Sequence, residues 1–380
     1  MPGKLSVCMI VRDEADVLPR CLASVAGFAD EIIAVDTGST DGSQEILRAA
    51  GAQVFEIPWP NDFGEARTAA LRYATGDWVL FIDADEAVDE ARAKNVRLLM
   101  VDIPQPVSFE VPILSYMDED ESGETALSWM PRLFNQPQQH FFYGRLHEQL
   151  IGSKPVRLDP TVLRLYHWGY QKSRVDAKGK EERNIALLTT EAGEHDGDSL
   201  RVELYLAAGA NDPHEILTHA RAALALIPPE LTAPAPIVTV CTLIIRGHIR
   251  LAQWTEATSQ AEALLVRFPM LENEAQYWHL VGEAHRGQDD FTGAEQAYRR
   301  AVDLVSENRV LQSFWNEIVP ANASLALAGL LARRGAQAEA QQVLEAALAR
   351  PGLGRDTRAR LQGALSSTFA GTNMLESAWD

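Results

Sequence analysis

Two carboxylates that are separated by one residue follow an apolar segment and could hold a metal ion. Asp83 and Asp85 come directly after residues 78–82, a run of apolar, strand-forming side chains. Alternate side chains of a strand point to the same side, so both carboxylates can face one spot. Mg²⁺ and Mn²⁺ take carboxylate oxygens and complete their coordination with water or phosphate. The pair could hold an ion that binds a diphosphate, or it could be a solvated acidic loop, since isolated Asp-x-Asp pairs are common.

The segments that precede this pair alternate between strand and helix patterns. Short apolar runs separated by amphipathic segments are typical of a parallel β-sheet with helices on both faces. Ligands of such α/β sheets bind beyond the carboxyl ends of the strands, where Asp83 and Asp85 are expected. The strand patterns cover residues 4–11, 31–36, 52–57 and 78–82, and the helical patterns cover residues 18–25, 44–50 and 63–71.

Four sequence blocks in this region resemble those of inverting family 2 glycosyltransferases, in the same order and at similar spacing. The resemblance implies a GT-A fold, which is Rossmann-like, and transfer of a sugar, of the hexosyltransferase type, from a nucleotide sugar. It also implies a divalent cation, Mg²⁺ or Mn²⁺, with Asp83 and Asp85 as metal ligands. The blocks are residues 7–14, 33–42, 63–67 and 83–86.

The resemblance further implies which side chains contact the donor. In this family the end of the first strand and the Asp after the second strand contact the base and ribose, and an arginine reaches the nucleotide. Arg67 matches that arginine, and its fork geometry suits phosphate. Family members often carry Asn where this chain has Thr68, and Lys where it has Arg12. The implied donor-binding residues are Val11, Arg12, Glu14, Asp36, Arg67, Asp83 and Lys180.

Asp36 has two candidate roles. Its carboxylate could accept a hydrogen bond from a base N–H group or a ribose hydroxyl. Alternatively, it could cap the turn that follows, although Ser39 and Asp41 are the caps that we expect there.

Three later blocks are similar to a bacterial branch of the family that carries tetratricopeptide repeats and includes peptide-modifying transferases of the sublancin type. They are residues 130–135, 142–148 and 165–170. The resemblance implies that His167 is a third metal ligand or a diphosphate contact. The alternative is an interior histidine beside Trp168 and Tyr170.

Glu148 is our candidate general base, because inversion needs a base beside the acceptor nucleophile. The alternatives are His147 and the acidic residues 118–121, which could also be a solvated loop.

A basic stretch follows His167. In the resembling branch this region can fold over the donor, where phosphates would attract it. The alternative is exposed helix charge. The stretch contains Lys172, Lys178, Lys180 and Arg183.

The second half of the chain changes from strand patterns to Ala- and Leu-rich helices. The spacing of small and aromatic residues between Trp278 and Ala301 is typical of a tetratricopeptide repeat, and weaker copies surround it at 216–228, 257–269 and 328–347. We therefore predict a GT-A domain over 1–195 and a tetratricopeptide-like helical domain over 196–380. Such arrays are concave, so we expect a peptide or protein partner. The alternative is an appendage for stability or homodimerisation.

Composition and charge argue against some classes of partner and indicate where the protein is located in the cell. The chain has 380 residues and a net charge of −19, which argues against nucleic acid and anionic lipid surfaces as partners. No transmembrane pattern or signal-peptide pattern is seen, so we expect a cytoplasmic protein. The cysteines, Cys8, Cys21 and Cys241, lack metal-binding spacing and are expected to be reduced, with Cys8 and Cys21 in the core.

We predict metal-dependent, inverting transfer of a sugar from a nucleotide sugar, with UDP as the commonest carrier in the family, to a peptide or protein. The alternatives are transfer to a lipid-linked or lipopolysaccharide saccharide and a catalytically silent scaffold. The sequence leaves the sugar, the base, the acceptor atom and the oligomeric state open.

Overall fold

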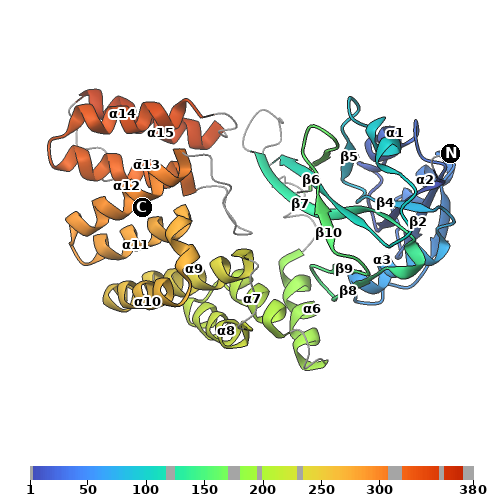
Figure 1. Cartoon of the computed structure of the whole chain (residues 1–380), viewed down its shortest axis with the longest axis horizontal. Helices are drawn as coiled ribbons and strands as arrows, with labels where there is room; N and C mark the ends of the chain where they lie inside the picture. The colour runs from blue at the N-terminus through green and yellow to red at the C-terminus, as the bar shows by residue number, and fades with distance from the viewer. Residues whose placement is uncertain are drawn as a thin grey trace. The chain divides into compact units, whose positions relative to one another are not determined.

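The computed structural model describes residues 3–116, 125–169, 180–194, 199–228, 234–306, 319–350 and 355–370. The chain divides into two compact units between Leu187 and Leu188, inside helix α6 (Lys180–Glu194). The first unit contains the strands and the second is helical (Figure 1). The predicted order, an α/β unit followed by an all-α unit, is confirmed.

The first unit is built on a mixed sheet. The strand order is β3-β2-β1-β4-β7-β6-β11-β5, and β1 pairs in parallel with both β2 and β4. The parallel sheet predicted from the first blocks is thus confirmed for its first four strands, whereas β7 adds antiparallel pairs with β4 and β6. The strands are β1 (Leu5–Val11), β2 (Glu31–Asp36), β3 (Gln53–Glu56), β4 (Trp78–Phe81), β5 (Glu86–Val88), β6 (Ser108–Tyr116), β7 (Thr125–Asn135) and β11 (Leu165–His167).

Strand β11 explains how a late histidine reaches the Asp-x-Asp pair. It pairs in parallel with β6 and antiparallel with β5, which places His167 opposite Glu86. Because β5 begins directly after Asp85, this pairing brings His167 to the carboxyl end of β4.

Both faces of the sheet are covered. Strand β1 alternates between them, with Val7 and Met9 in one apolar cluster and Cys8 in the other. Helices α1 (Leu18–Val25), α2 (Ser43–Ala49) and α4 (Asn95–Leu99) pack on the first face. Helix α3 (Phe63–Tyr73) and the hairpin of β8 (Phe141–Tyr143) and β9 (Gln149–Ile151) pack on the second. A further strand, β10 (Pro155–Arg157), pairs with β6. Cys8 and Cys21 are buried thiols, as predicted.

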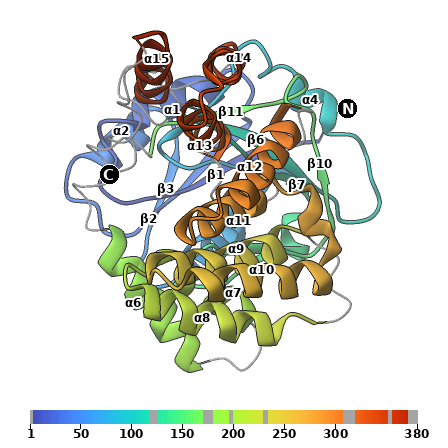
Figure 2. The ribbon, with the colours of Figure 1, turned by 90° about the vertical axis from the view of Figure 1, so that its left-hand side faces the viewer.

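The second unit is a series of antiparallel helices (Figure 2). Gly282 lies against Tyr298, because an added Cβ would be 2.4 Å from the Tyr298 ring, so α11 and α12 approach closely there. This is the small and aromatic spacing that predicted a repeat. The helices are α7 (Ser199–Gly209), α8 (Pro213–Leu226), α9 (Pro234–Arg250), α10 (Trp254–Arg267), α11 (Ala275–Gly287), α12 (Phe291–Ser306), α13 (Val319–Arg333), α14 (Gln337–Leu348) and α15 (Arg355–Ala370).

The weaker repeat copies also lie in helices of this unit. Ala220 of α8, Ala257 and Ala261 of α10 and Ala340 of α14 are buried, as expected for helices that approach closely. None of the helices in the described part of the chain is both long and apolar enough to cross a membrane.

Candidate active site at the carboxyl edge of the sheet

The loops that follow β1 and β2 are fastened together by hydrogen bonds. The Asp13 N–H donates to Ser39 Oγ (3.0 Å), and the Thr40 N–H donates to Asp13 Oδ1 (2.7 Å). The Glu14 N–H donates to Ser43 Oγ (2.9 Å). These bonds make a fixed rim at the carboxyl edge of the sheet, beside the predicted donor residues.

Asp36 ends β2 at this rim and is completely buried. Its Oδ1 accepts from the N–H groups of Gly38 (3.0 Å) and Ser39 (2.9 Å) and from Gln44 Nε2 (3.0 Å). Although burial opposes ionisation, hydrogen bonds from Ser39, Gly38 and Gln44 lower the pKa of Asp36. Its Oδ2 is buried without a hydrogen-bond partner. One oxygen therefore caps the turn, and the other is an unmet acceptor, which costs stability unless a ligand supplies a donor.

The other rim residues differ in exposure. Val11 lies opposite Asp36, and its carbonyl accepts from the Thr37 N–H (2.9 Å). Arg12 is exposed. Burial and the nearby charge of Arg12 lower the pKa of Arg183 in α6, so two cations meet at this rim.

The structure describes little of the lysines in the predicted basic stretch. Lys172 and Lys178 lie outside the described residues, and only the backbone of Lys180, the first residue of α6, is described. The guanidinium of Arg183 lies 5.2 Å from the centre of the Phe63 ring. Of the predicted basic stretch, Arg183 is thus the side chain that the structure brings to the donor rim.

Asp83 lies between two arginines. Its Oδ1 is 2.7 Å from Arg67 Nη2, and its Oδ2 is 2.6 Å from Arg132 Nη2. Burial opposes ionisation, but the charges of Arg132 and Arg67 lower the pKa of Asp83. Both carboxylate oxygens are therefore engaged by protein cations, whereas the sequence predicts a metal ligand here.

Arg132 and Glu86 are site residues that the sequence analysis did not select. Arg132 Nη2 also lies 2.7 Å from Glu86 Oε1, and Glu86 Oε2 accepts from the Asp83 N–H (2.9 Å). Burial, together with the Asp83 charge, raises the pKa of Glu86 to about 7 despite the opposing Arg132 charge. The sequence feature that could have indicated Arg132 is its position next to the apolar residues Leu133 and Phe134, inside a segment that forms a buried strand.

Glu148 joins the site through Arg67. Arg67 Nε and Glu148 Oε1 form an ion pair, and the Arg67 guanidinium lies over the ring of Phe81, 4.7 Å from its centre. Helix α3 is fastened to β8, since the Phe142 N–H donates to Thr68 Oγ1 (2.9 Å). Arg67 therefore links the candidate base, Glu148, to Asp83, because it pairs with both carboxylates.

Among the described residues, the structure does not bring the alternative candidate bases to Arg67. His147 is exposed and has a left-handed backbone, with φ of 54°. The acidic residues 118–121 lie outside the described residues.

Asp85 faces His167. Asp85 Oδ2 lies 3.6 Å from His167 Nε2, and His167 Nδ1 is 3.1 Å from Ser115 Oγ. Burial opposes protonation, but Asp85 and the neighbouring acids raise the pKa of His167. Gly169 closes this space, because a Cβ there would lie 2.3 Å from Asp85 Oδ2 and 2.4 Å from His167 Nε2.

This donor set fits a divalent cation. A carboxylate oxygen and an imidazole nitrogen face each other, and Ser115 orients the ring through its other nitrogen. Within the described residues, no group of three His, Cys, Asp or Glu side chains has metal-ligand geometry. An ion between Asp85 and His167 would therefore take further oxygens from water or a diphosphate.

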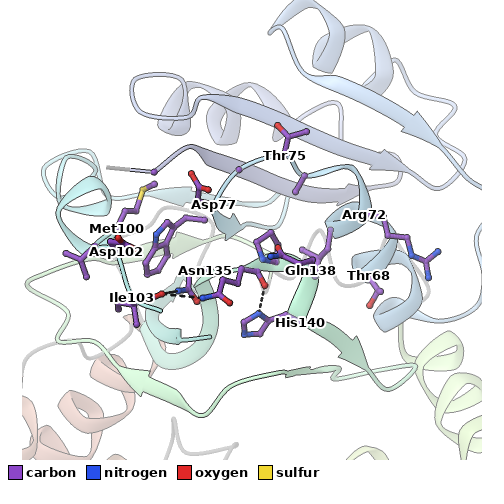
Figure 3. Close-up of a pocket in the computed structure, with 18 residues that line it drawn as sticks. Thr68, Arg72, Thr75, Asp77, Met100, Asp102, Ile103, Asn135, Gln138 and His140 are labelled. Atoms are coloured by element: carbon purple, nitrogen blue, oxygen red, sulfur yellow. Dashed lines mark hydrogen bonds between the residues drawn. The ribbon is translucent and has the colours of Figure 1, made fainter. Parts of the chain in front are cut away.

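A cavity of about 960 Å³ lies away from these groups, near the start of β4 and the end of β7 (Figure 3). Its polar side chains bond to protein groups: His140 Nε2 lies 2.8 Å from Ser153 Oγ, and Asn135 Nδ2 donates to the Ile103 carbonyl (3.2 Å). We assign it no chemistry, because its named polar groups are already satisfied.

Comparisons with known proteins identify a matching family model and several relatives of this chain. A family model, glycosyl transferase family 2, matches residues 6–152. A TPR repeat-containing protein of Synechococcus elongatus is 36% identical over 209 residues, which are 52% of this chain and 50% of that protein. Glycosyltransferase SunS of Bacillus phage SPbeta is 31% identical over 188 residues, 47% of this chain and 43% of that protein. The chain thus spans about half the length of the curated relatives it matches.

Among solved structures, the chain matches glucosyl-3-phosphoglycerate synthase from Mycobacterium tuberculosis, in complex with Mn²⁺, UDP and glucosyl-3-phosphoglycerate. The match is 25% identical and spans 30% of this chain and 44% of that chain, with a TM-score of 0.25. That overlap is too small to carry an assignment. The family match covers Asp36, Arg67, Asp83, Asp85 and Glu148.

Proposed function

We propose that the chain transfers a sugar from a nucleotide sugar to a peptide or protein, with inversion, and the match of the glycosyl transferase family 2 model to residues 6–152 supports this. The observation that carries the proposal is the meeting of Asp85, His167 and the arginine-held Asp83 at the carboxyl edge of the sheet. Open α/β sheets bind ligands at this edge.

The donor nucleotide lies over the rim formed after β1 and β2. Asp36 Oδ2 is buried without a hydrogen-bond partner, and in this proposal it accepts a hydrogen bond from the base or the ribose. Arg12 and Arg183 supply positive charge near the diphosphate, which also relieves their mutual repulsion. UDP is the carrier that we propose.

Asp85 and His167 would hold Mg²⁺ or Mn²⁺ in this proposal. The ion would neutralise charge on the departing nucleoside diphosphate. Asp83 holds Arg67 and Arg132 in place, and this is the role that we assign to it in preference to direct metal ligation. Those two guanidinium groups add positive potential on the leaving-group side of the site.

Glu148 takes the proton of the acceptor nucleophile. Its ion pair with Arg67 fixes the carboxylate near the site. An acceptor hydroxyl or thiol would then attack the anomeric carbon from the face opposite the leaving diphosphate, which inverts that carbon. His147 is the alternative base.

A peptide or protein acceptor is supported by the helical unit, because stacked helical pairs present an extended concave surface. Similarity to a TPR repeat-containing protein supports the helical repeats, and similarity to glycosyltransferase SunS supports the transferase activity.

Release of nucleoside diphosphate from a panel of nucleotide sugars tests the proposal. We expect release with Mn²⁺ or Mg²⁺, none with EDTA, and at least a hundredfold loss in Asp85→Asn, about the cost of removing an electrostatic stabiliser of the leaving group. Asp102→Asn is the matched control, because Asp102 is an exposed carboxylate that lines the distant cavity. Equal release by both variants would overturn the site. Release stimulated by a lipid-linked saccharide and not by peptides would favour the alternative acceptor.

A further inference from the structure

The ion pair between Arg67 and Glu148 restricts access to both side chains. The Arg67 side chain is 9% exposed and that of Glu148 is 12% exposed. Within the described residues, this pair is the single ion pair or hydrogen bond of the Glu148 carboxylate. Arg67 Nε and Nη1 are buried. A phosphate oxygen therefore cannot reach Arg67, and an acceptor cannot reach the paired oxygen of Glu148, while the ion pair is intact.

The ion pair leaves hydrogen-bond donors of Arg67 unused. Arg67 Nη2 donates to Asp83 Oδ1 (2.7 Å), but in the described part of the chain neither Nε nor Nη1 has a hydrogen-bond partner. Nε lies beside Glu148 Oε1 without hydrogen-bond geometry. Buried donors without acceptors cost stability. A phosphate group accepts two parallel N–H bonds from a guanidinium, so it would satisfy Arg67 better than Glu148 does.

Three acidic side chains share two guanidinium groups at this point. Arg132 pairs with Asp83 (2.6 Å) and Glu86 (2.7 Å), and Arg67 pairs with Asp83 and Glu148. Burial opposes the charge of Arg132, but Asp83, Glu86 and Glu148 raise its pKa above the usual value, so all three acids act on one cluster. A diphosphate brings further negative charge, so it binds there favourably only if one acid moves away.

Glu148 is the acid whose departure breaks the fewest contacts. Asp83 pairs with two arginines. The Glu86 side chain is 3% exposed, pairs with an arginine and accepts from the Asp83 N–H (2.9 Å). Glu148 lies just before β9 and follows His147, whose backbone is left-handed. Moving Glu148 breaks one ion pair, whereas moving either of the other acids breaks two contacts.

We propose that Arg67 exchanges Glu148 for a phosphate oxygen of the donor, so that donor binding frees the candidate base. Without the donor, Glu148 covers Arg67, and Arg67 holds Glu148 away from an acceptor. When the diphosphate binds, its oxygens accept hydrogen bonds from Arg67, and the freed carboxylate takes the proton of the acceptor nucleophile. The inference rests on the proposed function and adds an order of events to it, with donor binding before activation of the acceptor.

Calorimetric titration of the full chain with UDP, GDP and dTDP in the presence of Mg²⁺ tests this exchange. Glu148→Gln removes the competing charge, so we expect it to bind the preferred nucleotide about tenfold more tightly than the parent does. Sugar transfer should fall in the same variant, because the candidate base is lost. A carboxylate that acts only as a base would leave the nucleotide affinity unchanged.

Glu65→Gln is the matched control for the change in charge. Glu65 is exposed and lies on α3, two residues before Arg67. The variant removes the same charge from the same part of the chain without touching the ion pair. Its nucleotide affinity should stay within about twofold of the parent, because an exposed charge is screened by solvent.

A double-mutant cycle assigns the effect to Arg67. Arg67→Met should weaken nucleotide binding, and Glu148→Gln should add no gain in that background, since both groups act through one contact. Melting temperatures establish that each variant folds, and if Arg67→Met does not fold, the comparison of Glu148→Gln with Glu65→Gln decides alone. Equal affinity of Glu148→Gln and the parent, an equal gain in Glu65→Gln, or a full gain without Arg67 would overturn the proposal. Failure of the parent to bind any of the three nucleotides would instead contradict the proposed function.

Discussion

Asp83 and Asp85 are one residue apart in the sequence, but they have different neighbours. Two arginines engage both oxygens of Asp83, whereas Asp85 faces a histidine across 3.6 Å. The spacing alone predicts two equivalent ligands. The difference comes from Arg67 on α3 and Arg132 on β7, which reach Asp83 from elements distant in sequence, and local patterns do not encode such contacts.

Substitution of each aspartate separates the two roles. We expect Asp83→Asn to lower the stability of the first unit by about 2–4 kcal/mol, because two buried guanidinium groups lose their shared counter-charge while the carboxylate itself is partly exposed. Asp85→Asn should cost about 1 kcal/mol or less, since its ion pair with His167, at 3.6 Å, is loose. Urea unfolding at neutral pH measures both values. Equal losses would contradict different roles for the two carboxylates.

Substitution of Gly169 tests whether the space between Asp85 and His167 holds the metal ion. A methyl group there would lie within 2.4 Å of both side chains, so Gly169→Ala should displace one of them and abolish Mn²⁺ binding. Titration calorimetry with Mn²⁺ and UDP measures the loss. Gly209→Ala is the control, because no atom lies within 4 Å of its added Cβ. Unchanged Mn²⁺ affinity in Gly169→Ala would place the ion elsewhere.

At the scale of elements, apolar runs and their spacing predicted β1, β2, β4 and the helices between them. The same patterns did not predict that β7 would pair antiparallel with β4 or that β11 would join β5. These pairings join segments that are far apart in sequence, so they depend on tertiary packing and not on local propensity. The family resemblance selected His167, but the strand pairing explains its position.

Helix α3 and hairpin β8–β9 must approach closely for Arg67 to meet Glu148. Gly64 makes this possible, because a Cβ there would lie 2.8 Å from the Gly144 carbonyl oxygen. We expect Gly64→Ala to destabilise the first unit by about 1–3 kcal/mol through overpacking and to reduce transfer more than metal binding. Gly27→Ala, whose Cβ meets no atom within 4 Å, is the control. Thermal unfolding and diphosphate release measure the two effects, and a Gly64→Ala variant that matches the control would refute this packing role.

Glu31 joins the start of β2 to β1 and to the segment before β4. Its carboxylate accepts from Lys4 Nζ (2.8 Å), Ser6 Oγ (2.5 Å) and the Thr75 N–H (2.7 Å). Burial opposes ionisation, but these hydrogen bonds lower the pKa of Glu31 from 4.5 to about 2. A depressed pKa contributes stability above the unfolded-state value, and this stability is lost as pH falls from 4.5 toward 2.

Glu31→Gln should therefore remove part of the loss in melting temperature between pH 4.5 and 2. The variant should melt lower than the parent at pH 7, and the two curves should converge toward pH 2. Calorimetric scans across this range measure the difference. Parallel curves for the two proteins would show that Glu31 does not carry this pH dependence.

At the scale of the whole molecule, an α/β unit and a helical repeat unit occupy separate halves of the chain. The change from strand patterns to Ala- and Leu-rich helices predicted this order, and the spacing of small and aromatic residues between Trp278 and Ala301 predicted the repeat.

The central claim is that Asp85 and His167 hold the cation that binds the departing diphosphate. Anomalous diffraction from crystals grown with Mn²⁺ and UDP tests it most directly. We predict a manganese peak at about 2.0–2.2 Å from Asp85 Oδ2 and His167 Nε2, typical of such metal–ligand bonds, with phosphate oxygens in the remaining positions. A peak that touches neither residue, or UDP bound away from the carboxyl edge of the sheet, would contradict the claim.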